Sequence, residues 1–269
     1  MVLPIITSAP HDADSFGPFS SRVKLSPWQL GEFSDKYTAV TAYNHNAIGN
    51  LKSIVSRGLG SLNQPRDLSL FKLKDFHGNT IWKDEAELSE KEKKECFEKY
   101  HDRYHNDIER LIKRSKTLGF DKVILWDHHD TGDFDEKTQK RDRKLPGEER
   151  TMPKFILSNF GMQHTGELNP ENEFTSCPPE FIQQVQDYMA YEFDLPHSEV
   201  EINTSYKGGH IIQTYGNPKN DFGNTVVGIQ IEYNRGFIMD QRTRLPYKDK
   251  LKEFNEKFNR VMEKACGLI

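Results

Sequence analysis

Residues 122–131 read KVILWDHHDT, an apolar run that passes without a break into a cluster of ionisable side chains. The apolar part, Val123 to Trp126, predicts a short buried strand. Two adjacent histidines flanked by aspartates are costly to bury at the end of such a strand unless they serve a purpose. In open α/β sheets, ligands bind beyond the carboxyl ends of the strands. The stretch therefore predicts a strand of an α/β sheet with a functional site at its tip.

Strand-type and helix-type segments alternate on both sides of this stretch. Ser89 and Glu92 form a capping box at the start of the longest predicted helix, and Gly119 closes it. Short apolar or alternating runs predict strands, and apolar spacings of three and four predict helices. The predicted strands cover residues 2–8, 122–126, 153–158, 199–204, 209–215 and 225–233, and the predicted helices cover about 35–56, 89–119, 179–193 and 248–265.

This alternation predicts one α/β domain over residues 1–269, with a central mixed, mostly parallel sheet and helices on both of its faces. The length suits one substantial domain and is short for two full ones. No internal repeat or linker divides the chain. Residues 133–150 are almost wholly polar, which predicts a surface loop or a lid.

Composition narrows the class of protein. The formal net charge of -4 does not favour nucleic acid or an anionic membrane as a partner. Cys96, Cys177 and Cys266 are odd in number and far apart, as expected in a reducing compartment. The N-terminal residues lack the basic segment of a secretory signal, and no stretch approaches the ~20 apolar residues of a membrane span. A cytoplasmic protein is expected.

A second polar cluster follows the first predicted strand. Pro10 is followed by His11, Asp12, Ala13 and Asp14. A histidine and a carboxylate three residues apart on a turn can face one point, which suits a tetrahedral metal. A solvated turn rich in aspartate would have the same composition, so this cluster alone leaves both interpretations open.

A third cluster lies in the last predicted strand, GIQIEYNR at residues 228–235. Strand alternation places Gly228, Gln230 and Glu232 on one face. A carboxylate inside an apolar run either pairs with a cation or takes part in chemistry. Arg235 is near enough in sequence to be that cation.

The three clusters together favour a hydrolytic zinc site. Two histidines and a carboxylate would hold Zn²⁺ with one position open for water. Glu232 would take the proton of that water, and an arginine would bind a substrate carboxylate through two hydrogen bonds. Such a constellation predicts hydrolysis of an amide next to an acidic group.

The motifs resemble those of the N-formylglutamate amidohydrolases, which are related in fold to aspartoacylases and zinc carboxypeptidases. The shared features are the Pro-His turn at residues 9–11, Tyr104-His105, Asp127 to Thr131, Ser176-Cys177-Pro178, Asn203, the run 206–211, Tyr215-Gly216, the run 230–235 and Met239-Asp240.

The resemblance implies a zinc carboxypeptidase/phosphorylase-hydrolase-like fold and hydrolysis of N-formylglutamate to formate and glutamate, as in histidine degradation. It implies that His11 and His129, rather than His128, bind zinc and that Glu232 is the catalytic base. The substrate, a small N-acyl amino acid, would lie against Asn203 and Arg235, and the double glycine Gly208-Gly209 would let the backbone approach it closely.

Two departures from the family pattern keep alternatives open. The family usually has Ser-Gly after the Pro-His turn, so the carboxylate ligand is either Asp14 or Asp35, with Asp35 favoured. The family's Asp-Leu-Asn-Arg is replaced by residues 61–66, SLNQPR, which keep Asn63 and leave Arg66 as the substitute arginine. There are two alternatives. The substrate is a different N-acyl amino acid or a peptide, or the chain is an inactive binding module of the same fold.

Two further histidine patterns favour weaker hypotheses. His101 and His105 are four apart on the long predicted helix, a spacing that can bind zinc, but a solvated or hydrogen-bonded pair is favoured because the glutamate of a metalloprotease helix is missing. Asp127-His128-His129 also occurs in manganese phosphoesterases, although the further Asp-rich motifs of that family are not found.

Overall fold

The computed structural model describes residues 1–83, 87–132 and 152–269. The predicted polar loop at 133–150 lies outside these residues. The strands are β1 Leu3–Ala9, β2 Ala47–Lys52, β3 Val123–Thr131, β4 Phe155–Ser158, β5 Val200–Ile202 and β6 Val226–Asn234. The helices are α1 Pro27–Glu32, α2 Thr38–Thr41, α3 Glu90–Cys96, α4 Arg103–Thr117, α5 Pro179–Phe193, α6 His210–Tyr215 and α7 Lys248–Ala265.

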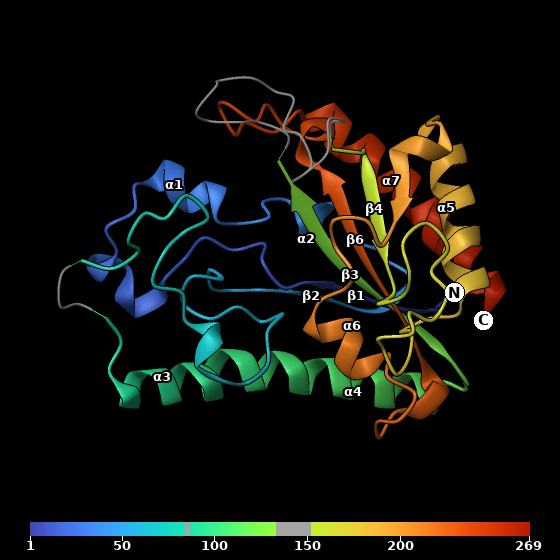
Figure 1. The fold of residues 1–269 in the computed structure, drawn as a ribbon, viewed down its shortest axis with the longest axis horizontal. Helices are drawn as coiled ribbons and strands as arrows, with labels where there is room; N and C mark the ends of the chain where they lie inside the picture. The colour runs from blue at the N-terminus through green and yellow to red at the C-terminus, as the bar shows by residue number, and fades with distance from the viewer. Residues whose placement is uncertain (84–86, 133–151) are drawn as a thin grey trace.

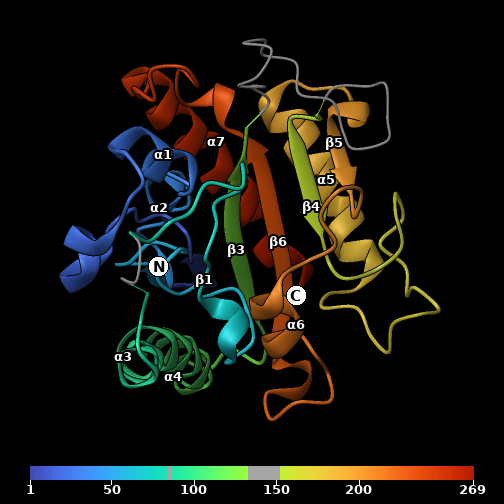
Figure 2. The same ribbon diagram turned by 60° about the vertical axis from the view of Figure 1, so that its left-hand side comes forward.

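The strands form one sheet in the order β2-β1-β3-β6-β4-β5 (Figures 1 and 2). All neighbouring strands are parallel except β4 and β6, which are antiparallel. The predicted mixed, mostly parallel sheet is therefore confirmed. The central pair, β3 and β6, is buried along its whole length and stays in register from Val123 opposite Val226 to Thr131 opposite Asn234.

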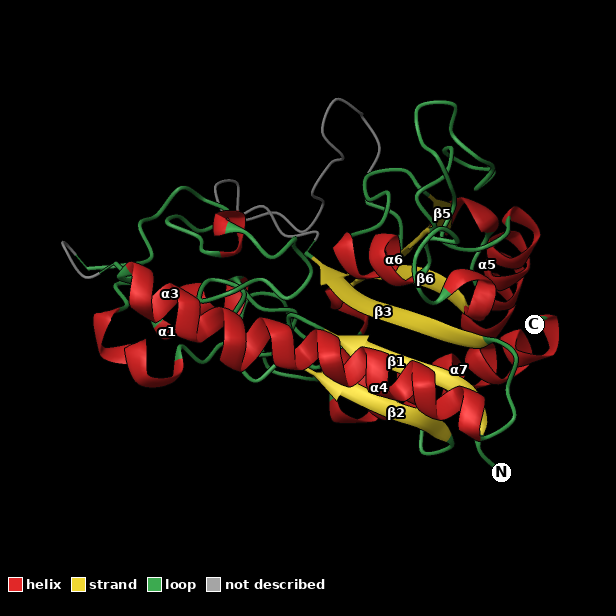
Figure 3. Cartoon of the chain, turned by 90° about the horizontal axis from the view of Figure 1, so that it is seen from below, coloured by secondary structure: helices red, strands yellow, loops and turns green. Residues whose placement is uncertain are grey.

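Helices cover both faces of the sheet, as predicted. One face packs against α4 and α6, whose Ile108, Ile112 and Ile211 share a buried cluster with Ile6 and Leu125. Figure 3 shows α4 running along this face, across β1 and β2.

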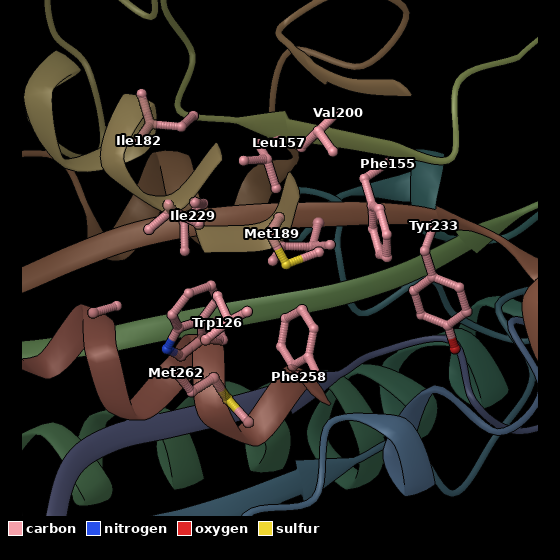
Figure 4. Packing of buried hydrophobic residues seen from close by; sticks show 14 of the residues in the cluster. Trp126, Phe155, Leu157, Ile182, Met189, Val200, Ile229, Tyr233, Phe258 and Met262 are labelled. Carbon is pink, nitrogen blue, oxygen red and sulfur yellow. The ribbon is translucent and has the colours of Figure 1, made fainter. Parts of the chain in front are cut away.

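The opposite face packs against α5 and α7. Trp126 meets Phe258 edge to face, with ring centroids 5.7 Å apart, and Met189 and Met262 fill the space around them (Figure 4). Alternation along β3 therefore points Trp126 and His128 into this core and leaves Asp127 and His129 on the other side.

The long helix begins as predicted. The Ser89 side chain accepts a hydrogen bond from the Glu92 backbone N–H, and the Glu92 side chain accepts one from the Ser89 backbone N–H. A π-helical segment, Phe97–Asp102, joins α3 to α4. Gly119 follows the helix with φ of 86°, a conformation that glycine adopts at no steric cost. The helices predicted at 179–193 and 248–265 are also present.

The helix predicted over 35–56 is wrong. The structure has only the short α2 there, followed by a turn and the edge strand β2. The turn is built by asparagine side chains: Asn44 Oδ1 accepts from the Asn46 N–H, and Asn50 Oδ1 accepts from the Asn44 N–H. Such local bonds compete with helix formation, and pairing with β1 then draws Ala47–Lys52 into the sheet.

The strand predicted over 209–215 is also wrong, because these residues form α6. The adjacent isoleucines Ile211 and Ile212 are typical of strands, but both are buried on this short helix. Gly209 is the N-cap residue, with an extended backbone that ends the preceding segment.

The strand expected at 122–126 continues to Thr131, so the ionisable cluster lies within β3 rather than beyond it. Among the described residues, no helix is long and apolar enough to cross a membrane.

Candidate active site

Three buried side chains from distant parts of the chain meet at the carboxyl edge of the sheet. His11 follows β1, His129 lies in β3, and Asp35 precedes α2. The His129 Nδ1 lies 3.1 Å from both His11 Nδ1 and Asp35 Oδ2, and His11 Nδ1 lies 3.4 Å from Asp35 Oδ2. The backbone bond from the Asp35 N–H to the His11 carbonyl, 2.9 Å long, holds the two segments together. Two imidazole nitrogens and a carboxylate oxygen therefore share one point.

Each histidine has a partner for its other ring nitrogen. His129 Nε2 lies 3.0 Å from Asp127 Oδ2, and His11 Nε2 lies 3.0 Å from Ser61 Oγ. A metal-binding histidine donates its second ring N–H to such a partner, which would leave Nδ1 of each ring for the metal. Both Nδ1 atoms lie beside Asp35. Two nitrogens and one oxygen are a donor set that fits zinc with a position left open.

Charge is concentrated around the shared point. Burial alone would lower the pKa of His129, but the Asp127 and Asp35 carboxylates outweigh it and raise that pKa well above its ordinary value. Burial raises the pKa of Asp35, yet Arg57 and the two histidines bring it well below the usual range. Burial lowers the pKa of His11 to about 3. The site thus keeps the Asp35 carboxylate ionised in a buried place, where it attracts a cation.

A hydrogen-bond network supports His129 from behind. Asp127 accepts from Ser8 Oγ at 2.8 Å on one oxygen and from Asn63 Nδ2 at 3.2 Å on the other. Ser8 Oγ lies in turn 2.9 Å from Tyr104 Oη on α4. The Asp127 carboxylate is therefore fixed in orientation, and the His129 ring with it.

Glu232 lies on β6 directly opposite His129 on β3. Its side chain is buried, and burial raises its pKa to about 8 against the lowering effect of the positive charge on His129. Its Oε1 accepts a 3.2 Å hydrogen bond from Gln230 Nε2. A carboxyl group with a pKa raised toward neutrality is suited to both taking and giving a proton.

His128 points the other way. Its ring meets Phe258 edge to face at a centroid distance of 4.8 Å, and neither ring nitrogen has a hydrogen-bond partner among the described residues. The structure thus brings His129, and not His128, to the three-residue cluster.

The cluster opens into a cleft of about 780 Å³. Among its lining residues are Arg57, Asn63, Lys207, Gly208, Gly209, Gln230, Glu232 and Arg235. Arg235 donates from Nε to Asp130 Oδ1 at 2.9 Å. The three-residue cluster, Glu232 and three cationic side chains therefore line one cleft.

Arg57 was not singled out by the sequence. Its guanidinium forms an ion pair with Asp35 and lies over the Phe76 ring, 5.4 Å from the centroid. Nothing in the local pattern marked it, because it lies at the end of the segment that was wrongly predicted as a helix.

Three of the predicted site residues lie elsewhere. Asp14 forms a 2.9 Å ion pair with Lys36 and is half-exposed, so of the two carboxylate candidates only Asp35 reaches the histidines. The Arg66 side chain is half-exposed and makes bonds of 2.7 and 2.9 Å to Asp102. Asn203 is buried against Asn159 and the Met162 carbonyl. None of the three is among the described residues that line the cleft.

His101 and His105 form hydrogen bonds to the segment that carries Asn63. His101 Nε2 lies 3.0 Å from the Gln64 carbonyl, and His105 Nε2 lies 3.0 Å from the Leu62 carbonyl. The favoured interpretation, a hydrogen-bonded pair, matches this placement.

Comparisons with known proteins agree on one family. The sequence model of the N-formylglutamate amidohydrolase family matches residues 3–239. An N-formylglutamate deformylase of Pseudomonas putida is 24% identical over an alignment of 210 positions, which covers 73% of this chain and 66% of that relative's length.

Two solved structures share the fold. A crystal structure of an N-formylglutamate amidohydrolase from Ralstonia eutropha JMP134 has a TM-score of 0.73 at 17% identity, covering 100% of this chain and 96% of that one. A gene product from Agrobacterium tumefaciens has a TM-score of 0.65 at 13% identity, covering 98% and 91%.

Proposed function

This chain belongs to the N-formylglutamate amidohydrolase family, and we propose that it is a zinc-dependent amidohydrolase that cleaves the N-formyl amide of an acidic amino acid. The proposed reaction converts N-formylglutamate and water to formate and glutamate. The observation that carries the proposal is the convergence of His11, His129 and Asp35 at one point, with Glu232 directly across from His129.

His11, His129 and Asp35 would hold the zinc ion, which when bound lowers the pKa of water and polarises a carbonyl. The supporting shell suits this role. The Nε2 atoms of His129 and His11 lie beside Asp127 and Ser61, so both Nδ1 atoms remain available to bind the metal. Arg57 offsets part of the charge of Asp35 and keeps that carboxylate ionised.

Glu232 would move the proton. In its ionised form it accepts a proton from water as the new C–O bond forms at the formyl carbon. It then delivers that proton to the amide nitrogen, and the C–N bond breaks to release the amine. One carboxylate serves both steps because its buried position keeps the two protonation states close in energy near neutral pH.

Cationic side chains would orient the acidic substrate. Arg235 and Lys207 line the cleft beside Glu232, and a guanidinium binds a carboxylate through two parallel hydrogen bonds. Gly208 and Gly209 also line this cleft. Gly208 has φ of 113°, and a Cβ there would lie 2.5 Å from Ile212 Cδ1.

The test combines metal analysis with a single substitution. We expect the purified protein to hold about one zinc per chain and to release formate from N-formylglutamate. Glu232→Gln should keep the metal and lose formate release. Full activity of Glu232→Gln would contradict the proposal, and a well-folded protein without metal or activity would favour the inactive binding module.

A second candidate keeps the site but changes the substrate. It is favoured by the placement of Arg66, the expected substitute for the family's arginine, outside the cleft lining and on Asp102. The substrate would then be another N-acyl amino acid or a short peptide. A panel of N-formyl, N-acetyl and longer N-acyl amino acids, compared by kcat/KM, separates the two candidates.

A further inference from the structure

Gln230 lies between a backbone amide and the proposed catalytic base. It occupies β6 two residues before Glu232, so both side chains leave the same face of the strand. Its Oε1 accepts from the Gly209 N–H at 2.6 Å, and its Nε2 donates to Glu232 Oε1 at 3.2 Å. Gln230 is buried, its bond to Glu232 is buried, and its bond to Gly209 is partly buried.

The orientation of the Gln230 amide is determined by its first partner. A backbone N–H can only donate, so the oxygen of the side chain must face Gly209. The NH₂ group must then face Glu232. This arrangement leaves Gln230 as a donor to the carboxylate and gives Glu232 one preferred position within the cleft.

Gly209 also packs against Asn63, which lies beside His129. A Cβ added at Gly209 would lie 2.2 Å from Asn63 Nδ2. Two residues later, the Ile211 N–H donates to Asn63 Oδ1 at 2.8 Å. Asn63 Nδ2 in turn lies 3.2 Å from Asp127 Oδ2 and 3.1 Å from His129 Nε2. The start of α6 therefore holds Gln230 on one side and Asn63 on the other.

We propose that Gln230 is a positioning residue for Glu232, and that it is held by Gly209, the same glycine that packs against Asn63. The start of α6 thus sets the position of the base relative to His129. The inference rests on the proposed function for its kinetic consequence, while its structural consequence can be measured without activity.

Two substitutions test the two bonds separately. Gln230→Ala removes both bonds, whereas Gln230→Glu keeps an oxygen for the Gly209 N–H and replaces the donor facing Glu232 with an acceptor. Both variants should keep the metal and lose about 10- to 100-fold in kcat for N-formylglutamate, the range typical of outer-shell partners. KM should change little, because the loss concerns the reacting step.

Gln186→Ala is the matched control. Gln186 also bonds to a backbone group, the Val200 carbonyl, but at the far edge of the sheet on α5 and β5. This variant should lose a comparable side-chain bond and keep the kcat of the unaltered protein.

Crystal structures of the metal-free variants provide the second measurement. The Glu232 carboxylate should leave its position in both Gln230→Ala and Gln230→Glu. An unmoved carboxylate in both, or a kcat within the range of Gln186→Ala, overturns the proposal. If the unaltered protein releases no formate from N-formylglutamate, the proposed function fails, and the position of Glu232 in the crystals still decides the role of Gln230.

Discussion

His129 and Glu232 face each other across the two central strands, at paired positions of the parallel ladder between β3 and β6. The proposed metal ligand and the proposed base are thus held by neighbouring backbone segments rather than by loops. Strand pairing fixes the positions of their Cα atoms, and the hydrogen bonds of the two side chains then place the imidazole and the carboxylate. Pre-organisation of this kind is what a proton transfer beside a reacting carbonyl requires.

Replacing Asp127 with asparagine should weaken metal binding. The asparagine side chain carries no charge, so it attracts the His129 ring less strongly than the carboxylate does. If its NH₂ group faces the ring, it also cannot accept a hydrogen bond from His129 Nε2–H. We expect a loss of about 10- to 100-fold in zinc affinity, measured by competition with a chromophoric chelator. Ser8→Ala removes only one bond to Asp127 and should cost less. Equal affinities for Asp127→Asn and the unaltered protein would contradict the proposed support role.

The two carboxylate candidates can be separated with a matched pair of variants. Asp35→Asn should abolish stoichiometric zinc binding, because Asp35 lies within reach of both Nδ1 atoms. Asp14→Asn should bind zinc normally, since Asp14 pairs with Lys36 at the surface. Elemental analysis after gel filtration measures both. The opposite pattern would assign the ligand to Asp14.

His128 should make the metal-free protein sensitive to acid. Burial lowers the pKa of His128 from 6.5 to about 3, so between these values the unfolded chain binds a proton that the folded chain does not. The contribution of His128 to the free energy of unfolding is therefore highest above pH 6.5. It falls by about 1.4 kcal/mol per pH unit as the pH drops toward 3.

The measurement is urea unfolding of the metal-free protein at pH 7.5 and pH 5.0, for the unaltered chain and for His128→Leu. Other buried histidines remain in both proteins, so their contributions cancel. The variant should lose less stability on acidification. It should also be no less stable at pH 7.5, because it removes two buried ring nitrogens that have no hydrogen-bond partner in the described part of the chain. Parallel pH dependences would refute this prediction.

Gly209→Ala should disrupt the site, because its Cβ would lie 2.2 Å from Asn63 Nδ2. Overpacking of this kind costs about 1–3 kcal/mol, and displacement of Asn63 should also reduce zinc affinity. Gly60→Ala is the control, since an added Cβ there meets nothing within 4 Å. Thermal denaturation and zinc titration of the two variants provide the comparison. Normal zinc affinity in Gly209→Ala would show that Asn63 can move without consequence.

The strongest sequence patterns predicted the central features of the fold. KVILWDHHDT and GIQIEYNR correspond to β3 and β6, whose apolar residues belong to a sheet covered on both faces. The capping box at Ser89 predicted the start of the long helix because its residues act locally. The clusters that contain His11, His129 and Glu232 could be singled out because polar groups in or beside apolar strands are rare without a reason. The choice of His129 over His128 came from the resemblance to the family.

The errors arose where tertiary contacts override local pattern. Residues 47–52 become a strand because they pair with β1, a contact that spacing within the segment cannot reveal. Ile211 and Ile212 favour a strand by type but are buried as helix because the turn at Gly209 places them there. Arg57 could not be found, since its importance depends on Asp35, 22 residues away.

The position of β6 in the sheet has a consequence for hydrogen exchange. It is flanked by β3 on one side and β4 on the other, and every one of its residues is buried. Backbone amides in such a strand exchange only when the whole domain opens. Glu232 and Gln230 are therefore carried by the part of the molecule that unfolds last, whereas Asp35 and Arg57 lie in connecting segments that open more easily. On gentle denaturation, the proposed zinc should be released while the strand bearing the proposed base is still protected from exchange.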